Sequence, residues 1–539
     1  MTVLHGIIGH PVNSDIERRI RLTNRMKAPS ADVTPNTWEF LLDPMIAPTG
    51  FREYDARWKF PHEINLPGMT ALGLGLGTQM RLRGLAPTIA VGNDYRESSL
   101  SIKYALIIGL VQAGIHVRDI GTALSPMAYF AQFHLEVPAL AMVTASHNPK
   151  GWTGLKIGFD RPLTHGPDEM AELKGIVLDG RGEARPGGAF EYIDGVGEAY
   201  LDDLVNGFRM SRRLKVVCAT GNGTASAFAP ELLTRIGVDV VESHNRLDYT
   251  FPNYNPNPEA MEMLHDMADS VRSSGADLAL GFDGDGDRIG VVGNDGEEIF
   301  ADKVGVILAR DLAKMYPGAT IVADIKSTGL FASDPELRAR GVVADYWKTG
   351  HSHMKRRIQD IGALAGFEKS GHYYFAEPLG RGYDCGLRAA VEICKLMDRN
   401  PDKSMSDLRN ALPRTYCSPT LSPYCADSEK YDVLTRLVGK LTARRQAGDK
   451  IAGRGIKEIV TVNGARVVLD NGGWGLVRAS SNTPNLVVVC ESPDSDAEMR
   501  AIFSDIDEII RTEHQVGRYD SCLSDNIGCG VASSSSTEA

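Results

Sequence analysis

A serine in the segment TASHNPK, residues 144–150, directly follows the apolar run 139–143. A serine on a loop after a buried strand reaches solvent, where backbone N–H groups and nearby cations can hold a phosphate. A turn closed by the serine hydroxyl is the plain structural alternative. Lys156 stands where its amine could return to the same site. The pattern predicts a phosphoryl carrier at Ser146, with Lys156 neutralising phosphate oxygens or transferring a proton.

The second chemical signal is the segment DGDGDR, residues 283–288, after the apolar run 279–282. Alternating glycines let the backbone fold sharply while three carboxylates converge, which suits a hard divalent cation. An EF-hand fits poorly, because Arg288 replaces its sixth-position glycine and Asn294 its twelfth-position glutamate. A solvated acidic turn is the alternative. Directly after an apolar strand, three carboxylates favour a metal site, with Arg288 beside it for a phosphate.

Strand-like runs followed by turns and helices must position these residues. We expect strands over 88–92, 139–143, 214–219, 279–282 and 320–324, and helices over 99–114 and from the turn 220–223 to 233. Such alternation is typical of βαβ units, whose functional loops lie at the carboxyl ends of strands. From about 415 the pattern changes to strands near 458–462 and 486–489 and a final helix, typical of a smaller α+β domain. GLGLG at 73–77 lacks dinucleotide-loop spacing, and we interpret it as a close-packed helix.

The overall composition excludes several classes of partner. The chain has 539 residues, too many for one core, and a formal net charge of −11. No basic face is available for nucleic acid or an anionic membrane, and no apolar stretch approaches the ~20 residues of a membrane span. The eight cysteines form no CxxC pair, so we expect reduced structural thiols. The first residues lack a secretory-signal pattern. We therefore expect a cytoplasmic protein with no nucleic-acid or membrane partner.

The two motifs resemble those of the α-D-phosphohexomutase superfamily, specifically its phosphomannomutase/phosphoglucomutase branch. Further segments resemble the family's in the family's order, between about 48 and 512: FREYDAR (51–57), GNDYR (92–96), DIK (324–326), TGH (349–351), EKSGH (368–372) and RASSNT (478–483). The resemblance implies an α/β fold of four domains around a central cleft. Three of them would be mixed-sheet α/β domains, and the fourth a smaller C-terminal α+β domain.

The implied domain boundaries follow the order of these motifs. We expect an N-terminal extension over 1–44 and a tail over 516–539 whose serine-rich end predicts disorder. Between them we expect domain 1 with the phosphoserine loop over 45–190, domain 2 with the metal-binding loop over 191–297, domain 3 with the sugar-recognition loop over 298–413, and domain 4 with the phosphate-binding loop over 414–515.

The resemblance implies an intramolecular phosphotransferase that interconverts hexose 1-phosphate and hexose 6-phosphate, of mannose, glucose or both. Phosphorylated Ser146 would phosphorylate the substrate, and the resulting hexose 1,6-bisphosphate would turn around and return its other phosphate. The implied metal is Mg²⁺, with the ligands Ser146, Asp283, Asp285 and Asp287. The implied catalytic residues are Ser146, Lys156, Arg288, His351 and His372. The implied substrate-binding residues are Tyr54, Arg57, His147, Lys326, Glu368, Ser370, Arg478, Ser480 and Asn482.

Two departures from the family pattern leave alternatives open. Lys369 stands where the sugar-recognition loop commonly has methionine or glutamate, which leaves the hexose preference open. Ser481 follows Ser480 where the family often has asparagine or glycine, so the individual roles of the hydroxyls stay open. A glucosamine or N-acetylglucosamine phosphate mutase, a catalytically silent sugar-phosphate-binding protein, and an enzyme with Asp283 as nucleophile are the alternatives. We expect a monomer or homodimer.

Overall fold

The computed structural model describes residues 42–481 and 483–519. The predicted N-terminal extension lies almost wholly outside these residues, as do Asn482 and the tail beyond Tyr519. The chain divides into two compact units. The first contains the residues up to Ala301 and the segment Ser370–Asp407, and the second contains Asp302–Lys369 and the residues from Leu408 onward.

The first unit opens with a six-stranded mixed sheet in the order β1-β5-β4-β2-β3-β6. The strands β4, β2, β3 and β6 run parallel, and β5 and β1 complete the other edge in antiparallel fashion. The strands are β1 Ala56–Lys59, β2 Thr88–Asn93, β3 His116–Thr122, β4 Ala139–Val143, β5 Trp152–Phe159 and β6 Ala189–Tyr192. After the short turn η1 Pro48–Gly50, the helices are α3 Leu66–Leu82, α4 Ser99–Gln112, α5 Ser125–His134 and α6 Pro167–Leu178.

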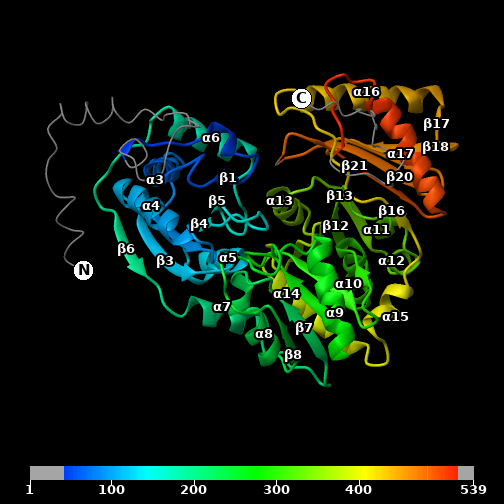
Figure 1. Cartoon of the computed structure of the whole chain (residues 1–539), viewed down its shortest axis with the longest axis horizontal. Coiled ribbons are helices and arrows are strands. Elements are labelled where there is room, and N and C mark those ends of the chain that lie inside the picture. Colours follow the sequence, from blue (N-terminus) through cyan, green and yellow to red (C-terminus); the bar gives the residue numbers. More distant parts are fainter. Residues whose placement is uncertain (1–41, 482, 520–539) are drawn as a thin grey trace, which may run out of the picture. The chain divides into compact units, whose positions relative to one another are not determined.

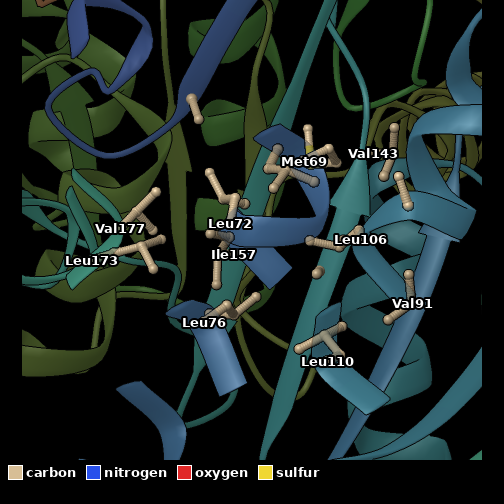
Figure 2. Close-up of a cluster of buried hydrophobic side chains, with 14 of the residues drawn as sticks. Met69, Leu72, Leu76, Val91, Leu106, Leu110, Val143, Ile157, Leu173 and Val177 are labelled. Atoms are coloured by element: carbon tan, nitrogen blue, oxygen red, sulfur yellow. The ribbon is translucent and has the colours of Figure 1, made fainter. Parts of the chain in front are cut away.

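The apolar core of this sheet lies under α3, α4 and α6 (Figure 2). Aliphatic side chains from the three helices meet those of the strands: Met69, Leu72, Leu76, Leu106, Leu110, Leu173 and Val177 with Val91, Val143 and Ile157. α3 and α4 approach each other through glycines, because a Cβ on Gly73 would lie 2.2 Å from the Leu106 carbonyl oxygen. A Cβ on Gly109 would lie 2.0 Å from that of Thr70. The predicted close-packed helix at 73–77 is confirmed.

A second sheet of five strands follows in the first unit, in the order β11-β10-β9-β7-β8. Its strands are β7 Lys215–Ala219, β8 Asp239–Ser243, β9 Leu278–Phe282, β10 Ile289–Gly293 and β11 Glu298–Ile299. The remaining helical elements of the first unit are α7 Val196–Val205, η2 Thr224–Ala227, α8 Ala229–Arg235, α9 Met261–Ser274 and α14 Gly386–Arg399. The unit also contains the short strand β15 Tyr373–Phe375.

The prediction of one continuous helix from the turn 220–223 to 233 is wrong. A 3-10 turn, η2, is followed by α8, and the two are separated at Phe228, whose φ of −128° and ψ of −41° leave the helical region. Pro230 then occupies the first turn of α8, where its missing N–H costs nothing. A proline that starts one helix also ends the segment before it.

The second unit contains three parallel strands in the order β13-β12-β14. The strands are β12 Thr320–Asp324, β13 Val343–Trp347 and β14 Ala365–Phe367. Their helices are α10 Ala301–Met315, which begins at the boundary of the units, α11 Leu330–Ser333, α12 Pro335–Ala339 and α13 His351–Ile361. The carboxyl ends of these parallel strands share one edge, which is where the sequence predicts substrate loops.

The last sheet of the second unit has six antiparallel strands in the order β16-β21-β20-β19-β18-β17. The strands are β16 Tyr416–Cys417, β17 Lys450–Ile451, β18 Arg454–Val460, β19 Ala465–Leu469, β20 Trp474–Ala479 and β21 Leu486–Ser492. α15 Met405–Asn410 precedes the sheet, and α16 Lys430–Ala447 and α17 Asp496–Ile510 pack with it (Figure 1).

Part of the segment that we assigned to a disordered tail packs on this sheet's helix. Val516 is buried, and the Tyr519 hydroxyl donates a hydrogen bond to Asp507 Oδ1 at 2.8 Å. The Tyr519 ring also contacts Phe503, with ring centroids 5.6 Å apart. The serine-rich composition of the last residues therefore does not predict the structure of residues 516–519, which pack on the domain. Within the described ranges, no helix combines the length and apolar composition that crossing a bilayer demands.

Candidate active site

Ser146 lies on the loop that follows the fully buried strand β4. Its φ is +53°, a left-handed conformation that costs a non-glycine residue about 1 kcal/mol or more. The Ser146 N–H donates to Thr144 Oγ1 at 2.8 Å, and its Oγ lies 3.3 Å from both Asp283 Oδ2 and His147 Nδ1. The hydroxyl therefore faces the predicted metal-binding loop, as a phosphoryl acceptor beside a cation must.

Arg96 holds the Ser146 loop in this strained conformation. Its Nη2 donates to the carbonyl oxygens of Ser146 at 2.5 Å and Asn148 at 2.8 Å, and its Nη1 donates to that of Pro149 at 3.2 Å. Asp94 fixes the guanidinium from behind, because its Oδ2 accepts from Arg96 Nε at 2.9 Å. The sequence places both residues in the GNDYR segment but gives no sign of their target, which lies some fifty positions away.

Replacing Arg96 with lysine should lower kcat on the order of tenfold to a hundredfold, because a single ammonium cannot bind three carbonyls as a fork does. The measurement is kcat for a hexose phosphate together with the phosphoserine content of the protein. Arg213→Lys is the matched control, since Arg213 forms an exposed pair with Asp239 in the same unit. An unchanged kcat in Arg96→Lys would show that the loop keeps its shape without the guanidinium.

The acidic loop joins the antiparallel strands β9 and β10. Its glycines are required by geometry: Gly286 has a φ of +72°, and a Cβ on Gly284 would lie 2.8 Å from the Ser146 carbonyl oxygen. Carboxylate oxygens of Asp283, Asp285 and Asp287 all lie within 4.8 Å of one another, and all three residues are fully buried. The glycines thus bring three charges together beneath Ser146.

Three buried carboxylates need a positive partner, and the donor set suits a hard cation. Burial, and then the charges of Asp287 and Asp285, raise the pKa of Asp283 well above its usual value. Among the described residues, Asp285 Oδ1 is buried and accepts no hydrogen bond. An oxygen of this kind can coordinate a cation. The residues therefore fit a divalent metal ion.

Lys156, on β5, provides part of the compensating charge. Its Nζ donates to Asp285 Oδ2 at 2.8 Å and also contacts Asp287 Oδ2. Burial alone would lower the pKa of Lys156, but the carboxylates of Asp285 and Asp287 outweigh it and raise the pKa. Lys156 is therefore a fixed positive charge in this arrangement and a poor proton acceptor.

Arg288 and His372 flank the other side of the acidic loop. Arg288 Nη1 donates to Glu259 Oε2 at 2.9 Å, and its Nε lies 3.3 Å from His372 Nε2. His372 Nε2 lies 3.4 Å from Asp287 Oδ1, and its Nδ1 lies 2.9 Å from Ser370 Oγ. Ser370 and His372, from the later segment of the first unit, therefore lie beside Arg288 and the acidic loop.

Two further acidic residues belong to this group and were missed in the sequence. Asp384 lies with Asp287 and His372 in a buried cluster whose ligand atoms are within 4.8 Å of one another. Glu259 binds the guanidinium of Arg288. Each stands alone between unrelated neighbours in the sequence, so spacing could not single it out.

Besides Ser370, three of the predicted substrate-binding residues lie in the first unit. Tyr54 is buried, and Arg57 on β1 pairs with Asp55 at 2.9 Å. Burial, and then the positive charges of Arg288 and His372, lower the pKa of His147 well below its usual value. The positive charge of Arg57 lowers the pKa of His147 further. A neutral imidazole next to Ser146 can accept a hydrogen bond.

In the second unit, Asp324 organises the predicted substrate loops. It ends β12 and accepts hydrogen bonds from Ser327 Oγ at 2.5 Å, Thr349 Oγ1 at 2.8 Å and the Lys369 N–H at 3.1 Å. One carboxylate therefore ties together the loops after β12, β13 and β14. The buried residues Lys326 and Glu368 lie in these loops, and the buried His351 begins α13 directly after one of them. Glu368 Oε1 accepts from the Gly350 N–H at 3.0 Å.

The predicted phosphate-binding loop begins at the end of β20. Arg478 is buried there, and its Nη1 donates to the Ala479 carbonyl oxygen at 2.8 Å. Ser480 Oγ accepts from the N–H of Thr483 at 3.2 Å and from its hydroxyl at 2.9 Å. Lys430 from α16, missed in the sequence, donates to the Ser480 carbonyl oxygen at 2.6 Å. Asn482 lies outside the described residues.

The predicted residues therefore form two groups. The first unit contains Tyr54, Arg57, Ser146, His147, Lys156, Asp283, Asp285, Asp287, Arg288, Ser370 and His372. The second unit carries Lys326, His351 and Glu368 at one sheet edge and Arg478 with Ser480 at another.

Models of four consecutive protein-family domains match the chain. Three are described as phosphoglucomutase/phosphomannomutase alpha/beta/alpha domains I, II and III, and match residues 48–182, 198–296 and 300–416. The fourth, the phosphoglucomutase/phosphomannomutase C-terminal domain, matches residues 428–509. The four-domain α/β architecture expected from the sequence is confirmed.

Curated relatives are similar over most of their length. A phosphomannomutase/phosphoglucomutase of Pseudomonas putida is 33% identical over 452 residues, which cover 84% of this chain and 93% of the relative. A phosphoglucomutase of Neisseria gonorrhoeae is 32% identical over 454 residues, covering 84% and 94%. The crystal structure of a phosphoglucomutase/phosphomannomutase family protein from Burkholderia thailandensis matches with a TM-score of 0.78 at 31% identity, covering 87% of this chain and 98% of that one.

Proposed function

Because the chain belongs to the phosphoglucomutase/phosphomannomutase family, we propose that it moves a phosphoryl group between O1 and O6 of a hexose through Ser146. The observation that carries this proposal is the position of Ser146 Oγ, 3.3 Å from Asp283 Oδ2 and next to three buried carboxylates. A serine that only closes a turn would need no carboxylates beside its hydroxyl, and a solvated acidic turn would need no serine beside it.

The reaction is a pair of reversible phosphoryl transfers. In the first, the bond between phosphorus and Ser146 Oγ breaks as a bond to the free hydroxyl oxygen of a hexose monophosphate forms, which gives hexose 1,6-bisphosphate. The bisphosphate then turns around, and its other phosphoryl group returns to Ser146. The hydroxyl that attacks loses its proton to a base, and the oxygen that leaves gains one.

The metal of this reaction is Mg²⁺ in our proposal. Asp283, Asp285, Asp287 and an oxygen of phosphorylated Ser146 would hold it, and it would offset the negative charge of the transferring group. Oxygen donors alone, without histidine or cysteine, favour Mg²⁺ over Zn²⁺. Arg288 and Lys156 add positive charge that acts on the same phosphoryl oxygens.

The other predicted residues divide between proton transfer and substrate binding. Lys156 is charged and held by two carboxylates, which favours His351 and His372 as the groups that carry protons. Glu368 and Ser370 would bind sugar hydroxyls, and Lys326 would bind the substrate after β12. Arg478, Ser480 and Asn482 would bind the phosphate that does not react. Tyr54, Arg57 and His147 would also bind the substrate.

A coupled assay with mannose 1-phosphate, glucose 1-phosphate and glucosamine 1-phosphate tests the proposal, in the presence of Mg²⁺ and priming hexose 1,6-bisphosphate. We expect turnover of the mannose and glucose esters that stops on chelation and returns with Mg²⁺. Turnover of the glucosamine ester should be lower by about a hundredfold, because an ammonium in place of a hydroxyl misfits the site. A preference for it would identify an amino-sugar mutase. Binding of all three esters without turnover would identify a silent sugar-phosphate-binding protein and overturn the proposal.

A cytoplasmic location and a monomeric or homodimeric state stay predictions from the sequence. Hexose phosphates are the only partners that the proposal requires.

A further inference from the structure

A group of two buried carboxylates and two partly buried lysines joins the third and fourth domains inside the second unit. We call Asp302, Lys303, Lys369 and Glu491 the ionic cluster. Lys303 Nζ donates to Glu491 Oε2 at 3.0 Å, and Lys369 Nζ lies 3.8 Å from Asp302 Oδ2. Asp302 and Lys303 lie at the start of α10, Lys369 lies in the loop after β14, and Glu491 lies on β21. The charges of the cluster balance, which a buried group requires.

Glu491 connects the cluster to the loop that carries Lys326. Its Oε1 accepts from the Gly329 N–H at 2.8 Å and from Thr328 Oγ1 at 3.0 Å. Burial would raise the pKa of Glu491, but the charge of Lys303 and the hydrogen bond from the Gly329 N–H lower it to about 2. The carboxylate therefore stays ionised and available to both lysines.

Arg466 reinforces the same junction. Its Nη1 donates to the carbonyl oxygens of Ile325 at 2.8 Å and Ser327 at 2.7 Å. Its guanidinium lies 3.7 Å from the centre of the Trp474 ring and 4.2 Å from that of Tyr346. The loop after β12 is thus bound to the fourth-domain sheet on both sides of Lys326.

Lys369 binds the sugar-recognition loop to this junction. Its Nζ lies 3.1 Å from Cys417 Sγ on β16, while its backbone N–H donates to Asp324 Oδ1 at 3.1 Å. The preceding Glu368 has a different partner, the N–H of Gly350. Two consecutive residues of the loop therefore have different partners: Glu368 contacts the loop after β13, and Lys369 contacts the fourth domain.

We propose that Lys369 is the positioning residue of the sugar-recognition loop: through Cys417 and the ionic cluster it fixes Glu368 relative to Lys326. The proposal rests on the proposed function, in which Glu368 and Lys326 bind the hexose phosphate. It gives the lysine at the variable place of the loop a role toward the protein and none toward the sugar. Hexose preference then does not depend on Lys369.

Lys369→Met tests the proposal, since methionine keeps the length and loses the charge. We expect KM for both glucose 1-phosphate and mannose 1-phosphate to rise on the order of tenfold by a common factor, with kcat changed less than about threefold. Lys369→Arg should restore most of the KM. Lys457→Met is the matched control, because Lys457 is an exposed lysine on β18 of the same unit.

Glu491→Gln distinguishes positioning from a direct sugar contact. Glu491 lies on β21 and contacts the loop of Lys326 and the ionic cluster, so it can raise KM only by changing the positions of the substrate loops. The double variant should then be no worse than the poorer single variant. A change in the ratio of the mannose and glucose KM values in Lys369→Met alone would show a direct contact and overturn the proposal. A lower melting temperature with unchanged KM would show a merely structural role and also overturn it.

Cys417→Ala serves if the charge variants fail to fold, because it removes only the sulfur that Lys369 contacts. We expect a smaller KM rise, again equal for both hexoses, and an unchanged KM would contradict the proposal. The wild-type protein separates this test from that of the function. An inactive wild type refutes the proposed function, whereas an active wild type beside an unaffected Lys369→Met refutes only the inference.

Discussion

Ser146→Ala should lose turnover of hexose phosphates by a factor on the order of 10⁴ or more, because the substitution removes the atom that carries the phosphoryl group. The fold should be unaffected, since the hydrogen bonds of Ser146 Oγ to other described residues are two long contacts of 3.3 Å. The measurement is kcat in the coupled assay, alongside the melting temperature and the label that the protein takes from radioactive hexose 1,6-bisphosphate. The wild type should keep this label on serine, and Ser146→Ala should take none.

The nature of the labelled bond distinguishes Ser146 from Asp283 as the nucleophile. A phosphoserine resists hydroxylamine, whereas an acyl phosphate on Asp283 would be cleaved by it. Ser273→Ala is the control, because Ser273 is an exposed serine on α9 of the same unit. Full activity of Ser146→Ala, or label that hydroxylamine releases, would refute the mechanism.

Lys156→Met should lower kcat on the order of a hundredfold or more, because the transferring group loses a fixed positive charge in a dry site. The same change leaves Asp285 and Asp287 without their lysine, a loss of about 3 kcal/mol or more for a broken buried pair. Mg²⁺ can replace part of that charge. Added Mg²⁺ should therefore raise the melting temperature of Lys156→Met more than that of the wild type.

Lys103→Met is the control for the general cost of breaking a buried ion pair. Lys103, on α4, lies with its Nζ 2.8 Å from Oδ1 of Asp119, on β3, and both residues are buried in the same unit as Lys156. This variant should be destabilised as well, but its kcat should stay within about twofold of the wild type and its response to Mg²⁺ unchanged. Equal kcat values for Lys156→Met and Lys103→Met would show that Lys156 has only a structural role.

The elements of the fold could be predicted where apolar runs end in turns. The strand expected over 139–143 is β4 with the same bounds, and that over 320–324 is β12. Such strands are buried on both faces, so their sequence is continuously apolar and their ends are distinct. The helix expected to end at 233 failed because two short helical segments share one apolar pattern and only Pro230 marks the second start.

The sequence predicted the parts of the candidate site that lie in short motifs. It did not predict the contacts between residues far apart in the sequence. Ser146 and the three aspartates stand in segments whose glycine or proline neighbours signal a loop. Arg96 and Lys430 hold the two phosphate loops through backbone carbonyls, which any sequence offers. Since a carbonyl acceptor leaves no mark on the residue type, no pattern in the sequence could pair these cations with their loops.

The glycines between α3 and α4 limit how this protein could be engineered. Glycine-to-alanine changes in helices are a standard route to a more heat-resistant protein, since alanine has the higher helix propensity and restricts the unfolded chain. At Gly73 and Gly109 the new methyl group would meet a carbonyl oxygen of the facing helix. α4 starts at Ser99, only three residues after Arg96, so any separation of the two helices would displace the guanidinium that holds the Ser146 loop. A thermostabilisation campaign should leave this pair of helices untouched.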